Sequence, residues 1–121
     1  MTSLDILVVD HKYAKVICRE MKRFLKDNDI KYHATADENN AIDLVKHRSF
    51  DLIVLDYDMP LKNGFQLAGE LRGIKKDIKI AGFSAYWNEK EAEEVGLVLY
   101  SSSLQPITDY ISKNLLFESS E

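Results

Sequence analysis

The chain has 121 residues, of which 45% are hydrophobic and 30% are charged, a length and composition that suit a single domain (residues 1–121) with one buried core. Its formal net charge of −4 excludes the overall basic surface of a domain that binds nucleic acid. Cys18 is the only cysteine, so no internal disulfide bond can form, and no apolar run is long enough to span a membrane; both features fit a cytoplasmic protein.

Short apolar runs alternate along the chain with longer segments in which apolar residues recur at helical spacing. The runs predict five strands, at residues 6–9, 30–34, 52–55, 78–83 and 97–100. Three of them are almost unbroken hydrophobic sequence, which is typical of parallel strands covered by helices on both faces.

Five helices are predicted between and after these strands. They lie at residues 17–25, 37–45, 65–74, 89–95 and 107–115. Asp37 is placed to cap the start of the second helix, and Gly96 is placed to cap the end of the fourth. The polar tail, about residues 117–121, is expected to be frayed.

This order of elements predicts an α/β fold of the (βα)5 type, a doubly wound five-stranded parallel sheet with helices on both faces. In such folds ligands bind outside the carboxyl ends of the strands, so the residues that follow each strand share one edge of the sheet. These residues are Asp10, His11, Asp56, Asp58, Ser84 and 101–103.

Three of these residues are carboxylates, which repel one another unless a cation lies between them. Oxygen ligands suit Mg²⁺, which takes one or two carboxylates and completes its coordination with water or phosphate oxygens. Asp10, Asp56 and Asp58 are therefore the candidate metal ligands. The alternative for Asp10 and Asp58 is a structural role, in which each caps a helix or shapes a turn.

Several short motifs occur along the chain in a characteristic order. They are residues 6–10 (ILVVD), 52–56 (LIVLD), Met59-Pro60, Asn63-Gly64, 83–85 (FSA) and Tyr100. Together they resemble the receiver domain of the two-component response-regulator family. The resemblance covers about Leu4 to Leu116, and it implies a flavodoxin-like strand order of 2-1-3-4-5.

The resemblance also implies roles for individual residues. Asp56 is then the phosphoacceptor, and it receives a phosphoryl group from a histidine kinase or a phosphotransfer protein. Asp10 and Asp56, with the backbone carbonyl of residue 58, hold Mg²⁺. Ser84 hydrogen-bonds the phosphoryl group, and Tyr100 turns inward when Ser84 moves. A downstream protein binds the face made by the fourth helix, the fifth strand and the fifth helix.

The chain departs from the pattern of this family at three places. His11 stands where the family usually has a second acid, and Ser103 stands at the position of its usual lysine. Imidazole is a poor Mg²⁺ ligand, and a neutral serine stabilises a phosphoryl group by about 1–2 kcal/mol less than a charged donor. We therefore expect weakened Mg²⁺ affinity. The segment 84–96 is also short by about one helical turn, which alters the expected partner face.

Some residues near this edge have two interpretations each. One hypothesis is that His11 is protonated among the carboxylates and supplies the missing positive charge; the alternative is that it points to solvent. Lys12 and Lys62 are other candidate cations, and ordinary solvated surface positions also explain them. Tyr86 and Trp87 either anchor a protein partner or pack over the short fourth helix.

Three functions fit these residues. The first is a phosphorylatable receiver, which Asp56 and Ser84 favour, and the second is a degenerate receiver that binds proteins without phosphorylation, which His11 and Ser103 favour. The third is a phosphatase, because the sequence DYD at Asp56 also resembles the nucleophile motif of haloacid-dehalogenase-type enzymes, although there it opens the fold. We predict the first function, in a monomer or weak homodimer that is no enzyme beyond catalysing its own phosphorylation and binds neither nucleic acid nor membrane.

Overall fold

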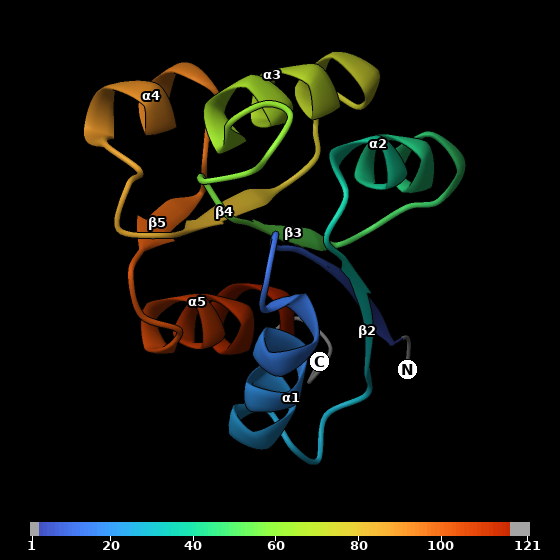
Figure 1. The fold of residues 1–121 in the computed structure, drawn as a ribbon. Coiled ribbons are helices and arrows are strands. Elements are labelled where there is room, and N and C mark those ends of the chain that lie inside the picture. Colours follow the sequence, from blue (N-terminus) through green and yellow to red (C-terminus); the bar gives the residue numbers. More distant parts are fainter. Residues whose placement is uncertain (1–2, 117–121) are drawn as a thin grey trace.

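The fold is a five-stranded parallel sheet between two layers of helices, seen in a computed structural model that describes residues 3–116 (Figure 1). The strands are β1 (Leu4–Val9), β2 (Ile30–Thr35), β3 (Leu52–Leu55), β4 (Ile80–Phe83) and β5 (Leu99–Ser101). They lie in the order β2-β1-β3-β4-β5, and each neighbouring pair is parallel. The predicted α/β class and strand order are confirmed.

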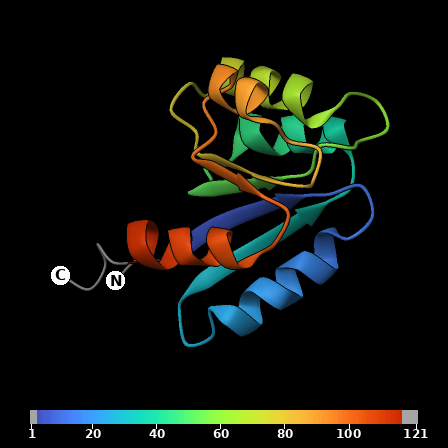
Figure 2. The ribbon, with the colours of Figure 1, turned by 90° about the vertical axis from the view of Figure 1, so that its left-hand side faces the viewer.

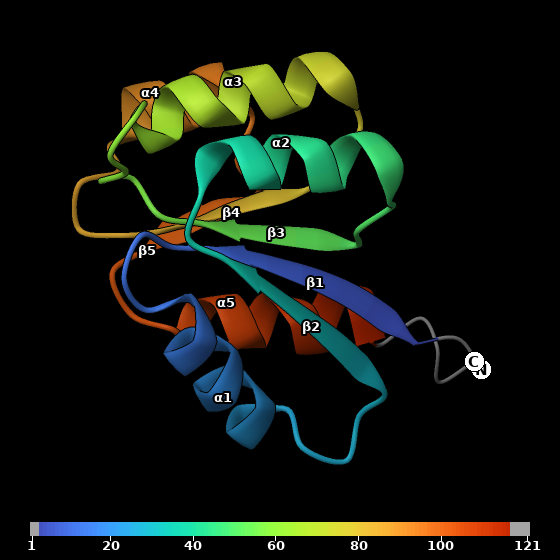
Figure 3. The same cartoon turned by 45° about the vertical axis from the view of Figure 1, so that its right-hand side comes forward.

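Helices cover both faces of this sheet. They are α1 (Ala14–Phe24), α2 (Glu38–His47), α3 (Gly64–Ile74), α4 (Glu89–Glu94) and α5 (Gln105–Tyr110). Figures 2 and 3 show α1 and α5 on one face of the sheet and α2, α3 and α4 on the other. No helix among residues 3–116 combines the length and the hydrophobicity that a membrane crossing requires.

The sheet divides the hydrophobic core into two parts, because successive residues of a strand point to opposite faces. In β1, Leu7 and Val9 pack with residues of α2 and α3, whereas Ile6 and Val8 pack with residues of α1 and α5. All four side chains are fully buried. This burial on both faces is the physical reason why the strand reads as an unbroken hydrophobic run.

The helix ends follow the predicted capping residues. Asp37 caps the start of α2, where its side chain accepts a hydrogen bond from the Asn40 amide at 2.9 Å. Gly96 follows α4 with a φ of 68°, a left-handed conformation that suits glycine. The fourth helix has six residues, one fewer than the predicted range of 89–95.

Several predicted boundaries differ from the structure. β4 begins at Ile80 rather than Ile78, because the Ile78 amide donates to the Lys75 carbonyl in a turn (3.2 Å). β5 is displaced toward Ser101, which pairs with Phe83 of β4 and so belongs to the strand rather than to the loop after it. The predicted fifth helix continues beyond α5 as a π-helix (Ile111–Leu116). The polar tail predicted at about 117–121 lies outside the described residues.

Candidate functional site

Two aspartates lie side by side at the carboxyl edge of the sheet. β1 and β3 are parallel neighbours with Val9 opposite Leu55, so the residues that follow them, Asp10 and Asp56, are brought together. The Asp56 amide donates to the Val9 carbonyl at 2.9 Å and holds this register at the end of the strands. The topology therefore unites two acids that are 46 positions apart in the sequence, as the strand pattern predicted.

An open pocket of about 220 Å³ contains these acids and most of the other predicted site residues. Its lining comes from the loops that follow β1, β3 and β4, and consists of Asp10, His11, Lys12, Tyr13, Asp56, Asp58, Ser84 and Tyr86. Tyr13 was not predicted as a site residue, although its place three residues after Asp10 was a usable signal. The predicted residues Tyr100 and Ser103 are not among those that line the pocket.

The Asp10 side chain is buried at the pocket, where it holds the turn between β1 and α1. Its side chain is only 7% exposed, and its Oδ1 accepts hydrogen bonds from the amides of Lys12 (3.0 Å) and Tyr13 (2.8 Å). These two bonds fix the turn that leads into α1. Asp10 therefore shapes a turn, one of its two predicted roles, while its role as a metal ligand stays a prediction. Within the described residues, only its Oδ1 oxygen accepts hydrogen bonds of this kind, so the turn does not occupy the other carboxylate oxygen.

The Asp56 carboxyl group lies close to two other carboxylates, those of Asp10 and Asp58. Partial burial, followed by the charge of Asp10 and to a smaller extent that of Asp58, raises its pKa above the ordinary value. The amides of Tyr57 and Asp58 act in the opposite direction, and Tyr57 donates to Asp56 Oδ1 at 2.8 Å. The pocket thus concentrates carboxylate oxygens around an acid that is half-buried.

The oxygen donors of this pocket fit Mg²⁺ by type. Within residues 3–116, none of the ion pairs involves Asp10, Asp56 or Asp58, so no side-chain cation neutralises their charge by direct contact. In the same part of the chain, no three side chains of His, Cys, Asp or Glu are grouped as a metal site. A hard cation held here would need main-chain or solvent oxygens beside two carboxylates, which is how Mg²⁺ is usually bound.

Of the two residues predicted to respond to the phosphoryl group, Ser84 lines the pocket and Tyr100 does not. Ser84 follows β4 and lines the pocket, where its Oγ accepts a hydrogen bond from the Tyr86 amide at 3.1 Å. Tyr100 lies in β5 with 41% of its surface exposed. The predicted switch aromatic is therefore on the surface in this structure.

The residues that depart from the family pattern, and the lysines predicted as candidate cations, do not all lie at the pocket. His11 and Lys12 are exposed and line the pocket. Ser103 is exposed, and its amide donates to Ser101 Oγ at 3.0 Å. Lys62 pairs with Glu70, with Nζ and Oε1 2.5 Å apart, and is not among the residues that line the pocket.

Comparison with known proteins identifies the family. The family model of the response regulator receiver domain matches residues 6–115. The chain belongs to this family. Its predicted place in two-component signalling is thereby confirmed.

Among similar proteins, two-component response regulator 24 of Arabidopsis thaliana is 32% identical over 94 residues, which are 77% of this chain and 66% of the plant protein. The sensor kinase/phosphatase LuxN of Vibrio harveyi is 24% identical over 106 residues, and the chain spans only 12% of its length. Among solved structures, TrrA of Thermotoga maritima in complex with Mg²⁺-BeF is 26% identical, with a TM-score of 0.71 over 91% of this chain and 97% of that one.

Trp87 is a core residue of this receiver domain, and Tyr86 is a surface residue. Trp87 is 5% exposed, and its Nε1 donates to the Leu55 carbonyl at 3.1 Å, directly before the predicted acceptor Asp56. Tyr86 is 67% exposed at the rim of the pocket. Of the two alternatives, packing holds for Trp87, and only Tyr86 is accessible to a partner.

Trp87 and Tyr57 join α4 to the end of β3. Their rings meet edge to face, with centroids 5.1 Å apart and planes at 84°. The Tyr57 hydroxyl donates to Glu91 Oε1 in α4 at 2.8 Å, and this bond raises the pKa of Tyr57. The contact joins residues 34 positions apart, and no local pattern in the sequence indicated it.

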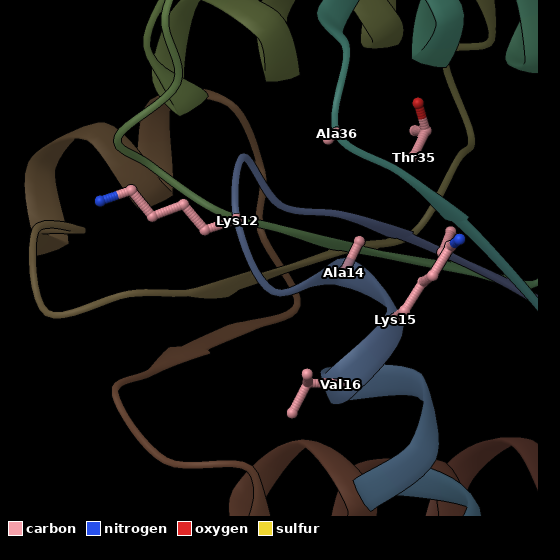
Figure 4. A pocket seen from close by; sticks show the side chains of 7 residues that line it. Lys12, Ala14, Lys15, Val16, Thr35 and Ala36 are labelled. Atoms are coloured by element: carbon pink, nitrogen blue, oxygen red, sulfur yellow. The ribbon is translucent and has the colours of Figure 1, made fainter.

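A second pocket of this receiver domain lies between the start of α1 and the end of β2 (Figure 4). Its one buried polar side chain is Thr35, whose Oγ1 accepts hydrogen bonds from the Asp37 amide (3.2 Å) and from Asn40 Nδ2 (2.8 Å). Figure 4 shows Lys12 extending away from the other labelled side chains. The Thr35 hydroxyl oxygen of this pocket is thus occupied by two donors from the start of α2 and the residue before it.

Proposed function

We propose that this receiver domain accepts a phosphoryl group on Asp56 from a histidine kinase or a phosphotransfer protein. The observation that carries the proposal is the juxtaposition of Asp10 and Asp56 in an open pocket that also contains the Ser84 hydroxyl. A nucleophile, a cation site and a hydrogen-bond donor are the parts that phosphoryl transfer requires, because positioning and charge neutralisation supply most of the catalysis.

In the proposed reaction, one Asp56 carboxylate oxygen forms a bond to phosphorus while the N–P bond of a phosphohistidine breaks. The leaving imidazole nitrogen keeps the electron pair of the broken bond, and Asp56 becomes an acyl phosphate. Asp10 and Asp56, with the backbone carbonyl of residue 58, would hold Mg²⁺. When bound, Mg²⁺ supplies positive charge to the phosphoryl oxygens. Ser84 can donate its own hydroxyl proton to one of those oxygens.

The surroundings of the pocket suit a protein as the phosphoryl donor. Three large apolar side chains stand exposed on the loops of this edge: Tyr13 at 59%, Leu61 at 67% and Tyr86 at 67%. Aromatic and aliphatic groups at a pocket rim are typical anchors for a protein partner. We further propose that a downstream protein binds the face made by α4, β5 and α5. Val98, just before β5, and Tyr100, within it, are exposed there. We expect these interactions to take place in the cytoplasm.

A fluorescence titration tests this function. Trp87 is the only tryptophan, and it contacts the residues on both sides of Asp56, so its emission should report ligand binding at that carboxylate. We expect a saturable change with Mg²⁺ and a further change with beryllofluoride, a phosphoryl mimic. Beryllofluoride without Mg²⁺ is the control and should have no effect. An unchanged emission at millimolar Mg²⁺ with beryllofluoride would contradict the proposal.

A degenerate receiver is the second candidate, and the position of Ser103 favours it. Ser103 is exposed, bonds to Ser101, and brings no positive charge to the pocket. Without a cation at that position, the phosphorylated state loses about 1–2 kcal/mol of stabilisation relative to a charged donor. A protein of this kind would bind partners through its folded surface alone.

Restoring the family pattern should strengthen the site. The double variant His11→Asp, Ser103→Lys adds one acid at the pocket and one flexible ammonium group beyond β5. We expect beryllofluoride to bind roughly 10-fold more tightly, which corresponds to about 1.4 kcal/mol. The matched control is His11→Asp, Ser102→Lys, which adds the same charges with the lysine one position away. Equal affinities of both variants would show that position 103 has no special access to the phosphoryl group.

A further inference from the structure

Glu38 is the most deeply buried charged residue in the described part of the chain. It occupies the first turn of α2, and only 2% of it is exposed. Acidic residues are seldom buried to this extent, because a carboxylate that leaves water must find hydrogen-bond donors. The location of those donors therefore indicates what this residue does.

The donors to Glu38 are two successive main-chain amides of the loop between β3 and α3. Its Oε2 accepts from the Leu61 amide at 2.5 Å and from the Lys62 amide at 3.2 Å. The side chain of Lys62 does not compensate this charge, because its ammonium group pairs with Glu70. The start of α2 supplies a favourable partial charge to a carboxylate in its first turn. Glu38 is thus a bridge from α2 to the loop backbone.

This loop carries the chemistry of the proposed site. It begins with Asp56, contains Asp58, and ends at Asn63, the N-cap of α3. The end of the loop is held by a capping box between Asn63 and Gln66, and the Gly64 amide donates to the Tyr57 carbonyl at 2.7 Å. These contacts do not involve the middle of the loop, residues 59–62, which must be held in place by other contacts.

Besides the ion pair between the Lys62 side chain and Glu70, two contacts restrain the middle of the loop. The Met59 side chain is 7% exposed and packs into the core part under α2 and α3. Glu38 binds the amides of Leu61 and Lys62, and Pro60 between these restraints has no amide proton to donate. An apolar contact limits where Met59 lies but does not orient a peptide group, whereas two hydrogen bonds to one carboxylate do.

We propose that Glu38 is a positioning residue for the Mg²⁺ and phosphoryl site. By fixing the peptides of Leu61 and Lys62, it holds the preceding backbone, and with it the carbonyl of residue 58 and the Asp58 carboxylate, in the arrangement that the pocket requires. This inference rests on the proposed function, because it assigns the loop geometry to metal binding. Residues outside the ligand shell commonly change metal affinity in this way.

Two substitutions of Glu38 and one matched control test the inference. Glu38→Ala removes the acceptor, so hydrogen exchange at the Leu61 and Lys62 amides should accelerate at least 10-fold and the Asp58 amide resonance should shift. We expect the Mg²⁺ dissociation constant to rise about 10-fold. Glu38→Gln keeps an acceptor oxygen and should retain most of the wild-type values. Glu70→Ala is the control, because it removes a carboxylate that pairs with the side chain of Lys62, whereas Glu38 accepts from the Lys62 main-chain amide.

The outcomes separate a positioning role from simple stabilisation. If Glu38→Ala lowers the free energy of unfolding but leaves the Asp58 resonance and the Mg²⁺ affinity unchanged, the residue is structural only and the inference is overturned. If the unchanged chain binds no Mg²⁺, that result contradicts the proposed function, which requires this cation. The loop geometry is then still tested without metal, since an unshifted Asp58 resonance and unaltered exchange in Glu38→Ala contradict the inference on their own.

Discussion

An Asp56→Asn chain is expected to take up no phosphoryl group under conditions that label the unchanged chain. Asparagine has nearly the same shape as aspartate, but its amide is not a nucleophile, so the O–P bond cannot form. The measurement is intact-mass spectrometry after incubation with Mg²⁺ and phosphoramidate, a small phosphoryl donor. The expected result is the mass of one added phosphoryl group on the unchanged chain and none on the variant.

Asp58→Asn provides the comparison within the same pocket. Asp58 lines the pocket but is exposed, whereas Asp56 is half-buried beside Asp10. This variant should still be labelled, because the nucleophile is retained. Labelling of Asp56→Asn together with loss of labelling in Asp58→Asn would move the acceptor to Asp58. An unchanged chain that resists labelling, and that also fails to respond to beryllofluoride, would favour the degenerate receiver.

Gly64→Ala is expected to destabilise the chain strongly. A Cβ at Gly64 would lie 2.3 Å from the Asp56 carbonyl oxygen, 2.8 Å from Tyr57 Cα and 2.9 Å from Trp87 Cζ2. Two of these atoms belong to the backbone, which cannot move aside without displacing the loop that carries Asp58. Overpacking of this kind costs about 3 kcal/mol, so we expect a loss of that order in the free energy of unfolding, measured by urea denaturation.

Gly69→Ala is the matched control on the same helix. Apart from its chain neighbours and the nearby backbone of α3, no atom of residues 3–116 lies within 4 Å of a Cβ placed at Gly69, and the position is exposed in the interior of α3. Alanine is favoured over glycine in a helix by about 1 kcal/mol, so this variant should be more stable than the unchanged chain. If both substitutions change stability equally, the close approach of Gly64 to the Asp56 carbonyl is not the cause.

Much of the fold could be predicted because its signals are local. Residues 6–9 and 52–55 are hydrophobic at every position, and the structure buries them on both faces of the sheet. Parallel strands covered on both faces require such runs, so the pattern and the architecture have one cause. The same topology predicts that Asp10 and Asp56 lie together, because both follow strands that end at one edge of the sheet.

The burial of Tyr86 and Trp87 could not be predicted from the sequence around them. Both are aromatic, adjacent and located in the same loop, so the sequence offered equal grounds for burying or exposing either one. Trp87 is buried because its indole finds the Leu55 carbonyl, and because Gly82 has no side chain where the ring lies: a Cβ there would be 2.7 Å from Trp87 Nε1. Tyr86 has no such place and remains exposed.

By itself, then, the sequence determined the parallel sheet, its helices and the acids at its carboxyl edge, because each depends on residues close together in the chain or on strand topology. Only the tertiary structure decided that Trp87 is a core residue, that Ser103 lies outside the pocket, and that Glu38 holds the loop beside Asp56. Those contacts of Trp87 and Glu38 join residues 32 and 23 positions apart. Whether such groups meet depends on how helices and loops pack over the sheet, and no periodicity of the sequence encodes that packing.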